Sequence, residues 1–152
     1  MNIPPELEAK IVHATNCRCP RCCPKAIDLG SAAVVDVPLP PSTNNLYLNV
    51  AWRGRVKSPE YRAWIDVASM LVLLLKPIRT KPFTITYTLV GGDGLNLGRD
   101  LGNFEKPLTD VLVSTGRIPG DSLRAGLWQI IQQYVECYEG EPYVGIEPKV
   151  LT

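Results

Sequence analysis

Apolar and polar residues alternate along three stretches of the chain with the period of two that is typical of strands. The apolar positions are Val35, Val37 and Leu39 in the first stretch, Leu46, Leu48 and Val50 in the second, and Phe83, Ile85, Tyr87 and Leu89 in the third. Prolines close the first stretch, and threonines fill the intervening positions of the third. The pattern predicts three strands, the third with one buried face.

A different spacing follows the second stretch, where apolar residues recur three and four apart as on one face of a helix. They are Tyr61, Trp64, Ile65, Ala68, Leu71, Val72 and Leu75. Ser58 offers a hydroxyl N-cap, Pro59 suits the first helical position, and Glu60 lies near the positive end of the helix dipole. We expect an amphipathic helix that ends before Pro77.

A second helix is expected at about residues 102–115, with Pro107 early in it and Gly116 ending it. The stretch 124–137 fits a helix or a strand, and the turn at 139–141 with the β-like run after it favours a terminal hairpin. The order β-β-α-β-α-β-β predicts an α/β (mixed α+β) fold. We expect a single domain over residues 32–152, with a small mixed sheet and two helices, preceded by an extension at 1–31.

Composition sets limits on the partners. The 152 residues are 45 % hydrophobic and 20 % charged, and the formal net charge is only +1, so any anion binding must come from local clusters rather than bulk charge. The apolar run at 70–75 is too short to span a bilayer, and the N-terminus lacks the basic and apolar regions of a secretory signal. We therefore expect a cytoplasmic protein that has no membrane partner.

Cysteines cluster in the extension, in the stretch "CRCPRCC". Two interpretations remain open: a structural zinc site, or a tail with reduced thiols. The zinc ligands would come from Cys17, Cys19, Cys22, Cys23 and His13. Strong zinc motifs have two pairs with the two-residue gap of Cys19 and Cys22, and this chain has one. Cys137 is expected to be a small core residue.

The stretch "RDLGNFEKPLTD" spaces Asp100, Asn103, Lys106 and Asp110 by three, three and four residues, which places them on one helix face. The face could be an ordinary solvated one, with Asp100 as an N-cap and Lys106 paired with Asp110. It could also hold Mg²⁺ or Mn²⁺ and a phosphate, since both ions favour oxygen ligands. The sole histidine lies in the extension, so the chemistry open to the main domain is that of carboxylates and lysine, as in metal-assisted phosphodiester hydrolysis.

Basic residues gather near two aromatic ones. Arg53, Arg55, Lys57 and Arg62 lie close in sequence to Trp52 and Tyr61. They form either a DNA-binding patch that contacts the backbone phosphates or a solvated face.

Three stretches give the chain a resemblance to a known family: "PLPPSTNNLY", "RGRVKSPEYRAW" and "RDLGNFEKPLTDVLVSTGRIPGDSL". From about Val35 to the C-terminus the sequence resembles the RusA-type Holliday junction resolvases (crossover junction endodeoxyribonucleases) of bacteria and their prophages. The resemblance implies a small homodimeric α/β nuclease of DNA recombination and repair that requires Mg²⁺ or Mn²⁺. Such an enzyme would nick four-way DNA junctions symmetrically.

The resemblance also implies roles for single residues. Asp100 and Asp121 match the first and last metal-binding aspartates, and Lys106 matches the catalytic lysine. Asn103 and Asp110 fall on further motif positions, and we take Asn103 as a DNA contact and Asp110 as a further metal ligand.

One departure from the family pattern concerns Gly102, which stands where the family has a second aspartate. Water could fill the missing position, since magnesium keeps several waters, or Asp110 or Asp93 could replace the ligand. The alternative function is a catalytically weak or inactive module that binds junction DNA. A third possibility is that the cysteine cluster is a zinc module that docks a protein partner.

Overall fold

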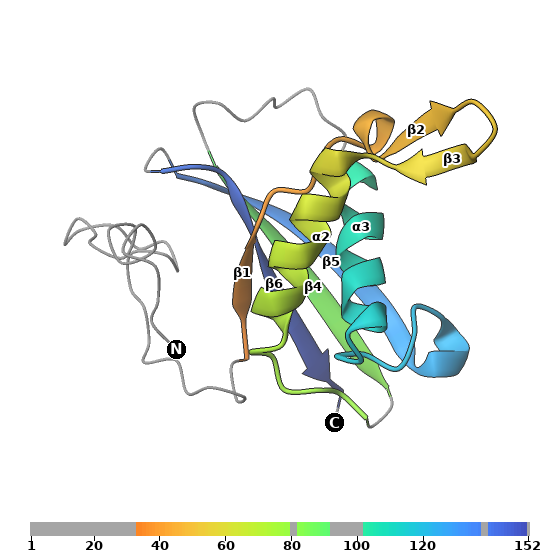
Figure 1. The fold of residues 1–152 in the computed structure, drawn as a ribbon. Coiled ribbons are helices and arrows are strands. Elements are labelled where there is room, and N and C mark those ends of the chain that lie inside the picture. The colour runs from red at the N-terminus through yellow and green to blue at the C-terminus, as the bar shows by residue number, and fades with distance from the viewer. Residues whose placement is uncertain (1–32, 80–81, 92–101, 138–139, 152) are drawn as a thin grey trace.

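The computed structural model describes residues 33–79, 82–91, 102–137 and 140–151, and two helices cover one face of a four-stranded sheet (Figure 1). In chain order the elements are β1 Val35–Pro38, η1 Thr43–Asn45, β2 Tyr47–Val50, β3 Gly54–Lys57, α2 Pro59–Val72, β4 Phe83–Gly91, α3 Gly102–Ser114, η2 Leu123–Ala125, β5 Leu127–Glu136 and β6 Tyr143–Val150. The mixed α/β class with its two helices is confirmed.

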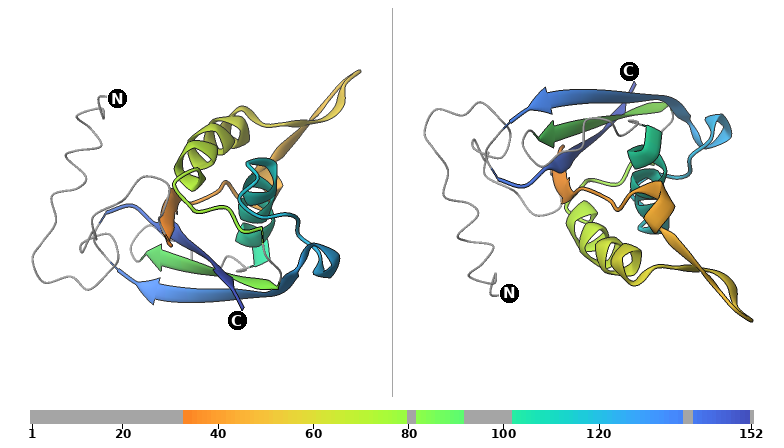
Figure 2. Two further views of the ribbon diagram at one scale, coloured as in Figure 1. Left: turned by 90° about the horizontal axis from the view of Figure 1, so that it is seen from below. Right: turned by 90° about the horizontal axis from the view of Figure 1, so that it is seen from above.

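The main sheet has the order β1-β6-β4-β5. β6 runs antiparallel to both β1 and β4, whereas β5 runs parallel to β4. α3 lies in the connection between the parallel strands β4 and β5, as crossover connections of this kind require. β4 is therefore a central strand, and its apolar face lies under the helices (Figure 2).

The core forms between the helices and the sheet. All four apolar residues predicted on one face of β4 belong to it, with exposed fractions from 0 % for Phe83 to 7 % for Leu89. The helices contribute the residues Tyr61, Trp64, Ala68 and Val72 from α2, and Phe104, Leu108, Val111 and Leu112 from α3. The period-two and period-3.6 patterns thus converge on one apolar interior.

The ends of both helices follow the local chemistry of the sequence. The Ser58 hydroxyl accepts a hydrogen bond from the Tyr61 amide at 3.1 Å, which confirms the predicted N-cap of α2. Gly116 adopts φ 71° after α3, and the Arg117 amide donates back to the Leu112 carbonyl at 2.9 Å. This is a glycine-ended C-cap, as predicted. Pro107 is the sixth residue of α3, so it lies beyond the first turn and leaves the Asn103 carbonyl without its usual helical donor.

Two expectations need correction. The predicted terminal hairpin is wrong, because β4 lies between β5 and β6 in the sheet. An additional strand, β3, precedes α2, and it pairs with β2 in a separate two-stranded sheet. The apolar residues Leu48 and Val50 therefore stay 47 % and 39 % exposed instead of joining the main core. α2 ends at Val72, before Pro77 as predicted. Two turns follow it, in which the Leu74 amide donates to the Leu71 carbonyl and the Leu75 amide donates to the Val72 carbonyl.

No helix in the described ranges is long and apolar enough to cross a membrane.

Candidate functional site

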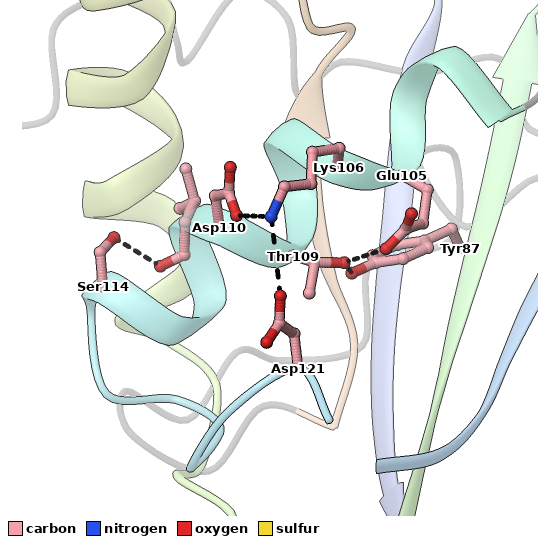
Figure 3. A network of polar contacts seen from close by, with 8 residues as sticks. Tyr87, Glu105, Lys106, Thr109, Asp110, Ser114 and Asp121 are labelled. Atoms are coloured by element: carbon pink, nitrogen blue, oxygen red, sulfur yellow. Dashed lines mark hydrogen bonds and ion pairs between the residues drawn. The ribbon is translucent and has the colours of Figure 1, made fainter. Parts of the chain in front are cut away.

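An ammonium group and two carboxylates meet on the exposed side of α3 (Figure 3). The Lys106 Nζ atom donates to Asp110 Oδ1 at 2.7 Å and lies 3.6 Å from Asp121 Oδ2. The pair with Asp110 is the one that the solvated-face interpretation predicted from the four-residue spacing. Asp121 comes from the loop after α3, so the fold brings together an acid and a lysine that the sequence separates by fifteen residues.

The loop that carries Asp121 is tied to the body at its start. The Arg117 guanidinium donates to the Leu75 carbonyl at 3.0 Å, and the Ile78 amide donates to the Arg117 carbonyl at 2.8 Å. Ile118, which is 2 % exposed, packs in the core. These contacts join the end of α3 to the segment after α2 and fix the direction in which the chain leaves the helix.

The residues beside Asp121 hold the end of this loop. A Cβ on Gly120 would lie 2.8 Å from the Ala125 Cβ atom, a distance that side chains do not tolerate, so the close turn requires glycine here. The Ser122 hydroxyl accepts from the Ala125 amide at 3.2 Å and caps η2. Asp121 therefore sits between two residues whose backbones are fixed by packing and capping.

Lys106 is held in its charged form by its neighbours. Its pKa lies above the ordinary value, chiefly because Asp110 accepts its hydrogen bond, and the charges of Asp110 and Asp121 act in the same direction. An ammonium of this kind does not serve as a base near neutral pH. It can offset negative charge on a bound anion such as a phosphate.

A polar chain on the sheet-facing side of α3 connects the helix to β4 (Figure 3). The Thr109 hydroxyl donates to Glu105 Oε1 at 2.8 Å and accepts from the Tyr87 hydroxyl, 2.7 Å away on β4. Burial raises the pKa of Tyr87, so its hydroxyl stays protonated and remains a donor. Because Thr109 is one residue before Asp110, this contact and the buried apolar face of α3 agree with a rotation that leaves Lys106 and Asp110 exposed.

The carboxylates are the residues of this cluster that could bind a divalent ion. No group of three or more His, Cys, Asp or Glu side chains gathers among the residues that the structure describes. Asp110 and Asp121 contact the Lys106 ammonium from two directions, so the ammonium lies between the two carboxylates. Magnesium can bind through as few as one or two carboxylates with water and phosphate, so these are the two described acids that could hold such an ion. Asp100 and Asp93 lie outside the described residues, and Gly102 is the first residue of α3.

The predicted DNA contacts lie on three elements. Arg53, Arg55 and Lys57 lie on the β2–β3 hairpin, and Arg62 is exposed on the first turns of α2. Asn103 accepts a hydrogen bond from the Thr43 hydroxyl at 3.3 Å, which connects the start of α3 to the segment leading into the hairpin.

Aromatic rings continue that connection. The rings of Tyr47 and Tyr61 meet edge to face at 5.8 Å, Tyr61 stacks on Trp64 at 6.0 Å, and the Trp64 indole donates to the Pro38 carbonyl at 2.8 Å. Burial raises the pKa of Tyr61, and the charges of Tyr47 and Asp110 add to the effect. Tyr61 thus lies within electrostatic reach of the carboxylate cluster while it anchors the base of the hairpin.

The cysteines fall into two groups, one in the N-terminal extension and one residue in the main domain. Cys17, Cys19, Cys22, Cys23 and His13 lie outside the described residues, so the zinc interpretation stays a prediction. Cys137 is 8 % exposed and packs with Val90 and Tyr143, as expected for a small core residue.

Compared with known proteins, the sequence matches no family model and no curated relative. The case for a function therefore rests on the geometry of the site and on the sequence motifs. The buried chain of Tyr87, Thr109 and Glu105 was not foreseen from the sequence, although the four-residue spacing of Glu105 and Thr109 offered a signal for half of it.

Proposed function

We propose that this protein is a metal-dependent endonuclease that cuts branched DNA, with four-way junctions as its substrate, as the resemblance to RusA-type resolvases implies. The observation that supports it is the approach of Asp121 to Lys106 and Asp110. A surface ion pair within α3 would need no acid from the following loop. The loop is held by a close glycine turn and a cap, which is the rigidity that a catalytic constellation requires.

Each residue has a task in this proposal. Asp121 and Asp110, together with Asp100, would hold Mg²⁺ or Mn²⁺. When bound, an ion of this class supplies Lewis acidity toward a phosphate and a water. Lys106 has three N–H donors, so its contacts with the two carboxylates leave at least one for a phosphate oxygen. Its raised pKa keeps it charged, so it offsets the charge that builds up on the phosphate in the transition state.

The site is open rather than enclosed, which suits a polymer. The side chains of Lys106, Asp110 and Asp121 are 63 %, 42 % and 52 % exposed. The hollow next to Glu105 has a volume of about 10 Å³, room for about one water, so it offers no pocket for a small substrate. A DNA backbone can reach an exposed cluster of this kind directly. A homodimer would place two such clusters on two related strands of a junction.

The test is an incubation of the full chain with a synthetic four-way junction, each strand end-labelled in turn, in Mg²⁺ or Mn²⁺. We expect nicks at symmetric positions in opposing strands. The substitutions Asp121→Asn and Lys106→Met should each lower the rate by roughly a hundredfold or more, the magnitude seen when one charge-stabilising group is removed. Glu147→Gln is the matched control. It also removes one charge of an exposed side chain, but its strand position places it on the sheet face opposite the helices, so it should cut like the wild type.

Two results would decide against the proposal. Nicks that persist in Asp121→Asn would show that the cluster does not perform the reaction. Tight junction binding without nicks, with cutting gained in Gly102→Asp, would favour the alternative of a binding module that has lost a metal ligand.

A further inference from the structure

The β2–β3 hairpin, residues 47–57, extends from the body of the molecule (Figures 1 and 2). Its two strands pair with each other and not with the main sheet. We call residues 47–57 the hairpin arm. Its base is fixed, because the Ser58 amide donates to the Leu46 carbonyl at 2.9 Å and the Tyr47 ring packs on Tyr61. The arm is thus anchored at its base while its tip is exposed.

One face of the arm is cationic. The strand register places Arg55 opposite Asn49 and Lys57 opposite Tyr47, so these four side chains share a face. Residues 46–57 contain three basic residues and no acidic one. Arg55 and Lys57 rest on aromatic rings, with 4.5 Å from the Arg55 Cζ atom to the Tyr47 centroid and 5.9 Å from the Lys57 Nζ atom to the Tyr61 centroid.

Within the described part of the chain, these cations have no anionic partner. No carboxylate of the described residues forms an ion pair with Arg53, Arg55 or Lys57. The aromatic rings hold the cations in place without neutralising them. The arm therefore presents a preorganised positive charge that complements a polyanion.

Trp52 occupies the tip under backbone strain. Its side chain is 103 % exposed, and its φ of 73° lies in the left-handed region that bulky residues avoid. The Arg53 amide donates to the Val50 carbonyl at 3.1 Å, so Trp52 stands at the third position of a tight turn, where a positive φ favours glycine. The fold gains nothing from a large apolar ring here, because the ring buries no surface.

We propose that the hairpin arm binds branched DNA at the point where strands separate, and that Trp52 stacks on an exposed base there. Arg55 and Lys57 contact the phosphates on either side of it. Bases within a duplex are already stacked, whereas a branch point offers a free base face, and aromatic rings bind such faces with little dependence on sequence. This inference rests on the proposed function, because it takes branched DNA as the ligand.

A second copy of this chain is the competing occupant, since Leu48, Val50 and Val56 form an apolar face on the other side of the arm. The charge pattern favours DNA. An arm that docks on another copy would bring its three basic side chains to a protein with a net charge of only +1, whereas DNA offers a phosphate at every step.

The experiment measures binding in Ca²⁺ or EDTA, with cleavage followed separately in Mg²⁺. A four-way junction carries 2-aminopurine at the crossover, and a duplex of equal length serves as the comparison. Trp52→Gly should lower junction affinity by roughly tenfold or more and abolish the fluorescence change at the crossover. Trp52→Gly should weaken duplex binding much less. Trp52→Phe should keep most of the junction affinity and most of the fluorescence change. Trp128→Ala is the control, since Trp128 is also exposed, at 68 %, but lies on β5.

The design separates the possible failures. Trp52→Gly relieves strain and removes no buried surface, so its thermal unfolding should occur at or above the wild-type temperature and a binding loss cannot be ascribed to misfolding. If the wild type binds and cuts junctions and Trp52→Gly does the same, the arm inference fails and the proposed function stands. If the wild type neither binds nor cuts, the proposed function fails as well. If Trp52→Gly differs from the wild type in sedimentation coefficient but not in junction affinity, the arm binds a second copy of the chain and the inference is overturned.

Discussion

The buried contact between α3 and β4 gives the most demanding prediction, because it can be tested by the coupling of two substitutions. Thr109 is 1 % exposed and Tyr87 is 4 % exposed. Replacing Thr109 by valine keeps the shape but removes the acceptor for the Tyr87 hydroxyl, 2.7 Å away. A buried hydroxyl left without a partner costs about 1–3 kcal/mol of unfolding free energy. For a domain of this size the melting temperature should fall by roughly 2–12 °C.

The other single substitution has a smaller expected cost. Tyr87→Phe removes one hydrogen bond, but Thr109 still donates to Glu105 at 2.8 Å, so the loss should be about 0.5–1.5 kcal/mol. In the double variant no buried hydroxyl is left without a partner, because phenylalanine has none. Its total cost should therefore be smaller than the sum of the two single costs, by at least about 0.5 kcal/mol.

Urea unfolding of the four proteins, followed by circular dichroism, measures the three differences. Thr115→Val combined with Tyr87→Phe is the control cycle, since the Thr115 hydroxyl bonds to the Val111 carbonyl of its own helix. Those two substitutions should be additive. Additivity within about 0.3 kcal/mol for the Thr109 cycle too would refute the coupling and with it the reasoning that this contact helps to hold α3 on β4.

Three further outcomes are expected. Ser58→Ala should lower the unfolding free energy by about 1 kcal/mol in urea titrations, whereas Ser58→Thr retains an N-cap oxygen. Because burial raises the pKa of Tyr87 above its ordinary value of 10.0, its contribution to stability is complete below that pH. It is lost as the pH rises further, since the unfolded chain then releases the proton first. Tyr87→Phe should show a shallower loss of stability in urea titrations above pH 10. Asp121→Asn should change the unfolding free energy by at most about 1 kcal/mol in urea titrations, since the pair with Lys106 is exposed. A larger loss of unfolding free energy would indicate a structural role and contradict the interpretation of Asp121 as a functional group.

Local chemistry made much of the fold predictable. Two helix ends depend on residues that are close in sequence: a serine and a proline begin α2, and a glycine follows α3. These ends can therefore be predicted from a short stretch of sequence. The alternation in β4 likewise reports burial of one face. These signals were sufficient for the class, the two helices and the faces that they bury.

Long-range pairing was not predictable in the same way. Residues 127–136 and 143–150 are neighbours in sequence, which favoured a hairpin, but β4 pairs with both of them. That outcome depends on which strand buries most apolar surface under the helices, and no short window contains the information. The second strand of the hairpin arm, β3, was missed for a related reason, since "RGRVK" carries an arginine-rich polar pattern that gives little sign of a strand.

The site divides along the same line. The four-residue spacing indicated the contact of Lys106 with Asp110. The resemblance, and not the spacing, indicated that Asp121 belongs to the same site. The support by Thr109 and Tyr87 requires knowing which face of α3 meets β4, and only the packed structure supplies that.

The balance of charge in the cluster has a consequence for the order of events on DNA. Two carboxylates against one ammonium leave Lys106, Asp110 and Asp121 net negative, so the cluster by itself repels a phosphodiester. A divalent cation would reverse that sign. Cation and nucleic acid are then linked ligands, each raising the affinity of the other by the same factor. The titration midpoint for Mg²⁺ should therefore fall when a junction is present, and the shift should disappear once the acid from the loop is neutralised.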